Sequence, residues 1–447
     1  MVNRSHSQKI VIPIVLAVFV GFFCPIYASA QEHGDEFVIG KYLKMHSKIL
    51  NEERTIVVNL PRGYENGHNS YPVLYFLDAD WEDLVPTVVA TSGYLNEFGS
   101  IPKMIVVGIC NTDRTRDMTP VKIEDEQTSG GAAFFLKFIS EELMPFIEKN
   151  YRTEPFKILF GGSYAGLFTV NAFLEKPETF KAYIASSPGI GACPDDLYEK
   201  AGSLFKKEKS LSRFLYMIYG ERDYPQSVGH TKDFYDFIKS NAPEGLECQM
   251  EIIGNEGHIP FIGLYKGLRF VFSEWAFPPN RITEAGLDEI KQHFRRIAKK
   301  YGYEVIIPAD LLIGLGYWSI RKEKIAEAIE ALLLACELHP YSPDAFYYLG
   351  EAYEKNNQID LALKNYKKAR EVDPSYLMAK QKIQSLEKER LFLLEKSPQT
   401  FDTVWSFQPA LGDLDNDGDL DVVLPNMGKH YSQVFFNNGK GTFEDSG

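Results

Sequence analysis

Strand-length apolar runs that alternate with amphipathic stretches are the feature that most constrains the fold of residues 37–277. Val, Ile, Tyr and Phe dominate the runs, and Gly, Pro or Asp bounds most of them, as is typical of β-strands. The clearest amphipathic stretch, residues 132–150, has apolar side chains at helical spacing. Strands buried on both faces and separated by helices predict an α/β fold, with a mostly parallel sheet and helices on both faces. The runs cover residues 55–60, 73–78, 104–110, 156–161, 182–186, 214–220 and 249–254.

The first thirty residues have the pattern of a signal peptide. Arg4 and Lys9 form a basic start, residues 10–23 are apolar, and Ala28–Ala30 fits the small-x-small rule for cleavage. We therefore expect a mature chain that begins at Gln31, is periplasmic or secreted, and has no membrane span after cleavage. An uncleaved anchor is disfavoured because the apolar run is short for a spanning helix.

Composition excludes several classes of protein. Hydrophobic residues make up 45% of the chain, which indicates globular domains rather than disorder. The net charge of −13 argues against a nucleic-acid partner, which would need a basic surface. The cysteines beyond the signal segment are too widely spaced for a zinc site or a disulfide framework, although one bridge stays open. They are Cys110, Cys193, Cys248 and Cys336.

The segment Phe160–Gly166 indicates a sharp turn between a strand and a helix. An apolar run precedes it and a helical pattern follows it, which is the context of a nucleophile elbow. The tight turn requires small residues two positions before and after the nucleophile, and Gly161 and Ala165 meet this requirement. Ser163 is therefore the candidate catalytic nucleophile.

A serine needs a general base at neutral pH, and the sequence offers two histidines after Ser163 within the α/β region. His258 follows the last strand and is favoured over His230, which lies early in a helical stretch. The acid that orients the base is expected after the preceding strand. Asp223 is favoured there over Glu221, and the choice between these two carboxylates stays open.

Two backbone amides should stabilise the negative charge that develops on the substrate oxygen. One is expected from Tyr164, at the start of the helix after the serine. The second is expected from the loop after the run 73–78, where Ala79, Asp80 and Trp81 are the candidates. This catalytic set requires no cofactor.

A repeat with a period of 34 residues begins after residue 280, where the sequence becomes helical. It resembles the tetratricopeptide repeat, in which small residues let two helices approach closely and a proline ends the second helix. Such repeats can hold a protein partner, but only two copies are clear, so packing against the rest of the chain is favoured. The matched pairs are Leu315-Gly316 with Leu349-Gly350, Ala328 with Ala362, Ala335 with Ala369, and Pro340 with Pro374.

The tail carries a carboxylate loop that runs into a strand. Its pattern, D-x-D-x-D-G-x-x-D, offers alternate oxygens on one turn and predicts a Ca²⁺ site, with a metal-free acidic turn as the alternative. The segment resembles a single integrin-type FG-GAP or VCBS repeat, and because a propeller typically needs at least four blades, we expect a truncated one. The predicted ligands are Asp413, Asp415, Asp417 and Asp421.

Residues 37–277 resemble the esterase family of α/β-hydrolases that includes esterase D and the enterochelin and trilactone siderophore esterases. The resemblance implies a carboxylic-ester hydrolase that works through an acyl-enzyme on a siderophore or another small ester, with Ser163, Asp223 and His258 as its triad. Members of this family often have His where this chain has Gly162. The matching segments are 73–78, 107–109, 114–120, 142–147, 161–167, 186–188 and 257–258.

The sequence therefore predicts four segments: a signal peptide (1–30), a hydrolase domain (31–279), helical repeats (280–396) and a β tail (397–447). Two other functions stay open. One is a surface scaffold that binds a partner through the repeats and the tail, with a vestigial hydrolase. The other is an acyltransferase with the same triad, which differs only in whether water or an alcohol attacks the acyl-enzyme.

Overall fold

The computed structural model describes residues 38–65, 67–259, 262–282, 284–395, 410–415, 420–424, 433–437 and 442–445. The predicted signal peptide and Asp417 lie outside these ranges. Among the helices described, none combines the length and the apolar character that crossing a membrane requires.

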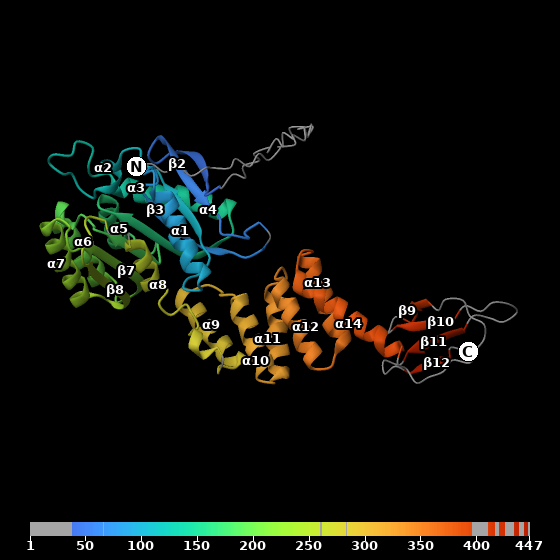
Figure 1. The fold of residues 1–447 in the computed structure, drawn as a ribbon. Coiled ribbons are helices and arrows are strands. Elements are labelled where there is room, and N and C mark those ends of the chain that lie inside the picture. The colour runs from blue at the N-terminus through green and yellow to red at the C-terminus, as the bar shows by residue number, and fades with distance from the viewer. Residues whose placement is uncertain are drawn as a thin grey trace, which may run out of the picture. The chain divides into compact units, whose positions relative to one another are not determined.

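An eight-stranded sheet with the order β1-β2-β4-β3-β5-β6-β7-β8 organises the α/β region (Figure 1). β1 and β2 form an antiparallel hairpin, β2 runs antiparallel to β4, and the other neighbours are parallel, which confirms the predicted mostly parallel sheet. The edge strand β1 was not predicted, because its largely exposed residues carry no apolar run. The strands are β1 (Lys41–Ser47), β2 (Glu52–Asn59), β3 (Tyr71–Leu77), β4 (Ile105–Ile109), β5 (Thr153–Gly162), β6 (Ala182–Ser186), β7 (Ser210–Gly220) and β8 (Glu244–Ile253).

Helices cover both faces of this sheet. α1 (Leu84–Glu97) and α8 (Gly263–Val271) pack together on one face, where they meet β4, β6 and β7. α5 (Tyr164–Glu175) lies on the other face against β5 and β6, with α2 and α6 beside it. The remaining helices here are α2 (Arg114–Met118), α3 (Ala132–Phe138), the short π-helix η1 (Ile139–Leu143), α4 (Met144–Asn150), η2 (Ile190–Ala192), α6 (Pro194–Lys207), α7 (Pro225–Asn241) and η3 (Pro279–Arg281).

The helical module follows the 34-residue period. α10 and α12 begin at Ala309 and Pro343, and α11 and α13 begin at Ile325 and Ile359. Close helix contacts occur at Gly316 and Gly350, where an added Cβ would lie 2.4 Å from Cγ of Leu332 and 2.7 Å from Cε1 of Tyr366, so small residues are required there. The helices are α9 (Leu287–Tyr301), α10 (Ala309–Arg321), α11 (Ile325–Leu338), α12 (Pro343–Lys355), α13 (Ile359–Val372) and α14 (Leu377–Glu395).

α9 shares an aromatic core with the α/β region. The Tyr301 ring lies 5.4 Å from the Phe156 ring and 5.2 Å from the Phe272 ring, measured between centroids. Its hydroxyl donates a 3.1 Å hydrogen bond to the Val271 carbonyl. α9 thus completes the core beneath α8 and is not a free linker.

The tail forms a small antiparallel sheet of four strands in the order β12-β11-β10-β9, as expected for a short β tail. Its core consists of Val422, Phe435 and Phe443. The strands are β9 (Ala410–Gly412), β10 (Asp421–Leu424), β11 (Gln433–Asn437) and β12 (Phe443–Asp445). Elsewhere in the chain, the four cysteines of the described ranges are free, so the bridge left open by the sequence is not formed among them.

Candidate active site

Ser163 occupies the turn between β5 and α5 in a strained backbone conformation, with φ 58° and ψ −121°. A non-glycine residue at such a φ costs on the order of 1–3 kcal/mol and persists only where its surroundings enforce it. Here the Ser163 amide donates to the Ser186 carbonyl at 2.9 Å. At Gly161 an added Cβ would lie 2.3 Å from the Ala165 carbonyl oxygen, so only glycine allows the helix to start this close to the strand.

His258 and Asp223 are in contact. His258 Nδ1 lies 2.8 Å from Asp223 Oδ1, and the Tyr224 amide donates to the same oxygen at 2.7 Å. The Asp223 side chain is fully buried, whereas that of His258 is about one-third exposed. Because an ionised carboxylate only accepts hydrogen bonds, this contact places the proton on Nδ1 and leaves Nε2 as the basic nitrogen.

Contacts among neighbouring residues bring the loop of His258 to the elbow. The Ile259 amide donates to Ser187 Oγ at 3.0 Å, at the end of β6. An added Cβ at Gly162 would lie 3.0 Å from Cγ2 of Ile259. The residue before Ser163 and the residue after His258 therefore lie close together, at the carboxyl-terminal ends of the parallel strands.

The structure separates the alternatives that the sequence left open for the acid and the base. Glu221 Oε2 accepts a 3.1 Å hydrogen bond from the Asn255 amide, so it braces the loop before His258, and Asp223 is the carboxylate bonded to that histidine. His230 lies on α7 against η2, where an added Cβ at Gly191 would come within 2.9 Å of the imidazole.

The loop after β3 carries one correction. The Ala79 amide donates to the Ile109 carbonyl at 3.1 Å, and the Trp81 amide donates to the Asp78 carbonyl at 3.0 Å. These donors are engaged in forming the turn, so the expectation that Trp81 or Ala79 offers a free amide is wrong. Within the described ranges, the amides of Asp80 and Tyr164 have no assigned hydrogen bond, and they remain the candidates for an oxyanion hole.

Arg114 fastens this loop to the elbow, a role that sequence reasoning did not assign. Its Nε and Nη2 bond the two carboxylate oxygens of Asp78 at 2.7 and 2.9 Å, and Nη2 also lies 3.4 Å from the Gly162 carbonyl oxygen. Asn111 Nδ2 bonds Asp78 and Asp80 at 2.9 and 2.8 Å. Arg114 opens the family-like segment 114–120, but its partners are far away in sequence, so only the fold reveals its function.

Two buried thiols near this end of the sheet, Cys110 and Cys193, are poor candidates for the nucleophile in place of Ser163. Burial raises the pKa of Cys110 to about 11 and that of Cys193 to about 12. Both therefore stay protonated at neutral pH, whereas the thiolate is the reactive form of cysteine.

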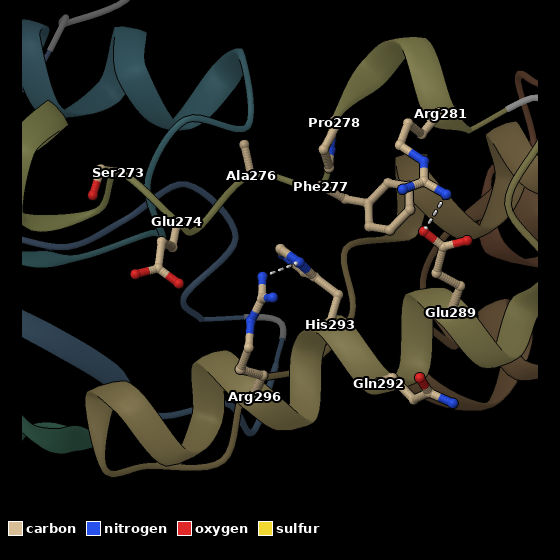
Figure 2. A pocket seen from close by; sticks show the side chains of 10 residues that line it. All are labelled: Ser273, Glu274, Ala276, Phe277, Pro278, Arg281, Glu289, Gln292, His293 and Arg296. Carbon is tan, nitrogen blue, oxygen red and sulfur yellow. Dashed lines mark hydrogen bonds and ion pairs between the residues drawn. The ribbon is translucent and has the colours of Figure 1, made fainter.

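A separate cavity of about 600 Å³ lies between the segment after α8 and α9 (Figure 2). An Arg281–Glu289 ion pair of 2.8 Å closes one side, and Arg296 Nη2 lies 3.2 Å from His293 Nδ1. None of the predicted site residues lines this cavity.

Three of the predicted Ca²⁺ ligands converge in the tail. Carboxylate oxygens of Asp413, Asp415 and Asp421 lie within 4.8 Å of one another, and the fourth, Asp417, lies outside the described residues. The buried Asp421 also accepts the amides of Leu414 at 2.7 Å and Asn437 at 2.9 Å. This all-oxygen donor set fits a hard cation such as Ca²⁺.

Comparison with known proteins agrees with this fold. Residues 47–225 match the family model described as "Putative esterase", and residues 343–376 match the tetratricopeptide repeat model. Ferri-bacillibactin esterase BesA of Bacillus subtilis (strain 168) is 27% identical over 227 residues, covering 45% of this chain and 78% of that protein. The siderophore triacetylfusarinine C esterase of Aspergillus fumigatus is 28% identical over 213 residues, covering 43% and 72%.

A solved structure supports the same fold. The IroE-like serine hydrolase from Shewanella oneidensis superposes with a TM-score of 0.59 and 26% identity, over 67% of this chain and 99% of its own. By sequence and by fold, the α/β part of this chain is similar to the esterase family of α/β-hydrolases, and a segment that matches the tetratricopeptide repeat follows it.

Proposed function

We propose that this carboxylic-ester hydrolase is an exported serine esterase in which Ser163 is the nucleophile, His258 the general base and Asp223 the residue that orients the base. One observation carries the proposal. A serine strained at φ 58° lies beside a loop whose histidine is bonded through Nδ1 to a buried aspartate. Export is supported by the signal-like pattern of the first thirty residues.

The chemistry follows from this geometry. His258 Nε2 takes the proton from Ser163 Oγ as that oxygen attacks the ester carbonyl carbon, and the amides of Tyr164 and Asp80 stabilise the resulting oxyanion. The intermediate collapses, the alkoxide leaves with the proton from the imidazolium, and an acyl-serine ester remains. Water then attacks this ester with His258 again as base, which releases the carboxylic acid and restores Ser163.

Siderophore esters are the proposed substrate class, because one relative is named as a siderophore triacetylfusarinine C esterase and another as a ferri-bacillibactin esterase. Ferri-bacillibactin and triacetylfusarinine C, the compounds in those names, are therefore the first natural substrates to test. Adding an alcohol acceptor and analysing the products distinguishes hydrolysis from acyl transfer, since a transferase would form the new ester in place of the acid.

The decisive experiment compares turnover of p-nitrophenyl acetate by the mature chain and by Ser163→Ala. We expect kcat/KM to fall at least about a thousandfold, because the nucleophile is lost. Ser240→Ala, a change of an exposed serine on α7, should keep the wild-type rate. Ser163→Ala retaining that rate would overturn the proposal.

A second pair of variants tests the acid. Asp223→Asn should lower kcat strongly, because an amide in that place favours the wrong histidine tautomer. Glu221→Gln changes a nearby carboxylate in the same way but should have a much smaller effect, since Glu221 contacts the Asn255 amide. Equal losses in the two variants would remove Asp223 from its role.

We also propose that the tail binds Ca²⁺ through Asp413, Asp415, Asp417 and Asp421. Calorimetric titration of the mature chain should detect one site that Asp415→Asn weakens, whereas Glu444→Gln, a change of an exposed acid on β12, should not affect it. The absence of binding to the wild-type chain would contradict the proposal. The serine mechanism needs no metal, so a chelator should leave ester hydrolysis unchanged.

A further inference from the structure

We propose that Ile259 determines which esters the site accepts, and that Ser187 is the positioning residue that holds Ile259 in place. Together they shape an apolar pocket beside the elbow for an uncharged apolar or aromatic part of the substrate. This inference rests on the proposed function and assigns specificity within it.

The backbone of Ile259 is strained. Its φ is 56°, in the left-handed region, where a β-branched residue is a genuine outlier. Its amide donates to Ser187 Oγ at 3.0 Å. Ser187 is itself buried at φ 45°, and its amide donates to the Ile218 carbonyl at 2.7 Å. Ser187, which is anchored to β7 by its backbone amide, therefore uses its hydroxyl to maintain the unfavourable conformation of the residue after His258.

The strain directs the Ile259 side chain to the elbow. An added Cβ at Gly162 would lie 3.0 Å from Cγ2 and 3.2 Å from Cδ1 of Ile259. Positions 162 and 259 therefore compete for one volume, directly beside Ser163. A methyl group at position 162 would require the Ile259 side chain to shift by a few tenths of an ångström.

Ile259 forms one wall of a cavity of about 440 Å³, within the range of about 300–1,000 Å³ that is typical of ligand pockets. Two residues of its lining are sequence neighbours of the proposed catalytic groups, since Ile259 follows His258 and Trp81 follows Asp80. The cavity therefore lies beside the reacting groups. Its interior is apolar, and the carboxyl groups of Glu82 and Asp83 disfavour an anionic occupant. The lining residues that make it apolar are Trp81, Leu84, Val88, Phe160, Ile259 and Leu264.

The test measures kcat/KM for two ester series on the full mature chain. One series lengthens the acyl group, from p-nitrophenyl acetate to butanoate and hexanoate, and the other enlarges the alcohol, from phenyl acetate to 2-naphthyl acetate. Ile259→Ala should raise the ratio of kcat/KM for the larger ester to kcat/KM for the smaller ester about tenfold in one series, because it widens the pocket. The series that responds identifies the part of the substrate that the pocket holds. Unchanged ratios in both series would overturn the inference.

Ser187→Ala should shift the same ratio in the same direction, because Ile259 can then relax. A simple loss of stability would not move this ratio. The matched control is Ser92→Ala, which removes a buried, hydrogen-bonded hydroxyl from α1 and should leave the ratio unchanged. If Ser187→Ala keeps the wild-type ratio of kcat/KM values, Ser187 does not position Ile259.

Gly162→Ala gives an independent test of the shared volume. Its effect on the ratio should be much smaller in the Ile259→Ala background, where the space is already free, and additive effects would contradict the contact. These outcomes remain distinct from failure of the proposed function, which Ser163→Ala tests by total activity.

Discussion

Buried charges away from the triad hold the elbow region together. Arg54 is fully buried in β2, and its Nη1 bonds Asp117 Oδ2 at 2.6 Å, while its Nη2 donates to the Cys110 carbonyl at 3.0 Å. Asp117 lies on α2, the short helix that begins with Arg114. The ion pair therefore ties α2 to the sheet, and Arg114 then ties the loop after β3 to the turn of Ser163.

Breaking this pair should cost far more stability than breaking an exposed one. Asp117→Ala leaves the buried Arg54 guanidinium short of negative charge, and we expect a loss of about 3–5 kcal/mol in the free energy of unfolding, measured in urea. The control, Glu53→Ala, breaks the exposed Lys44–Glu53 pair and should cost no more than about 1 kcal/mol. Similar losses in both variants would contradict the structural role of the Arg54–Asp117 pair.

Among the secondary-structure elements, helix pairs in the repeat module depend on small residues at their crossings. Gly350 on α12 meets the buried ring of Tyr366 on α13. The period in the sequence predicted this small position, because an interval of 34 residues brings equivalent helices to equivalent contacts. The edge strand β1 shows the reverse case, since its sequence carries no apolar run and it pairs with β2 along the backbone, with one exposed ion pair between Lys44 and Glu53.

Gly350→Ala should destabilise the module by about 1–3 kcal/mol, because the added methyl would overlap the Tyr366 ring. Gly202→Ala is the matched control, since Gly202 lies within α6 and an added Cβ there meets nothing within 4 Å. That variant should gain about 0.5–1 kcal/mol from the higher helix propensity of alanine. Urea unfolding followed by far-UV circular dichroism measures both, and a stable Gly350→Ala protein would refute the predicted clash.

At the scale of the whole chain, α9 lies beyond the predicted end of the hydrolase domain, yet it packs into the core of that domain. The boundary predicted between residues 279 and 280 remains a prediction, but aromatic packing extends past it to Tyr301. The helical region therefore stabilises the catalytic region through α9, which lies beyond the segment that matches the esterase family model.

Tyr301→Ala should lower the temperature at which esterase activity is lost, because the truncation opens a cavity among Phe156, Phe272 and Trp275 and costs about 3–5 kcal/mol. The turnover of p-nitrophenyl acetate at 25 °C should stay near that of the wild type. Tyr341→Ala, at a position 62% exposed, should shift the inactivation temperature little. If Tyr301→Ala inactivates at the wild-type temperature, α9 is not part of the catalytic core.

Local patterns allowed much of this protein to be predicted from its sequence. The elbow around Ser163 could be recognised because its small neighbours meet steric requirements between residues only a few positions apart. The parallel sheet and the helical repeats likewise follow from spacings of apolar and small residues along the chain. In all these cases the physical requirement lies within one element or between neighbouring ones.

The tertiary structure decided which distant groups meet. It placed Asp223 rather than Glu221 on His258, engaged the Trp81 amide in a turn, and brought Ile259 against Gly162. These contacts join residues from separate strand ends, at distances set by the twist and register of the whole sheet. A spacing along the sequence carries no record of such distances, because they arise only when the strands assemble.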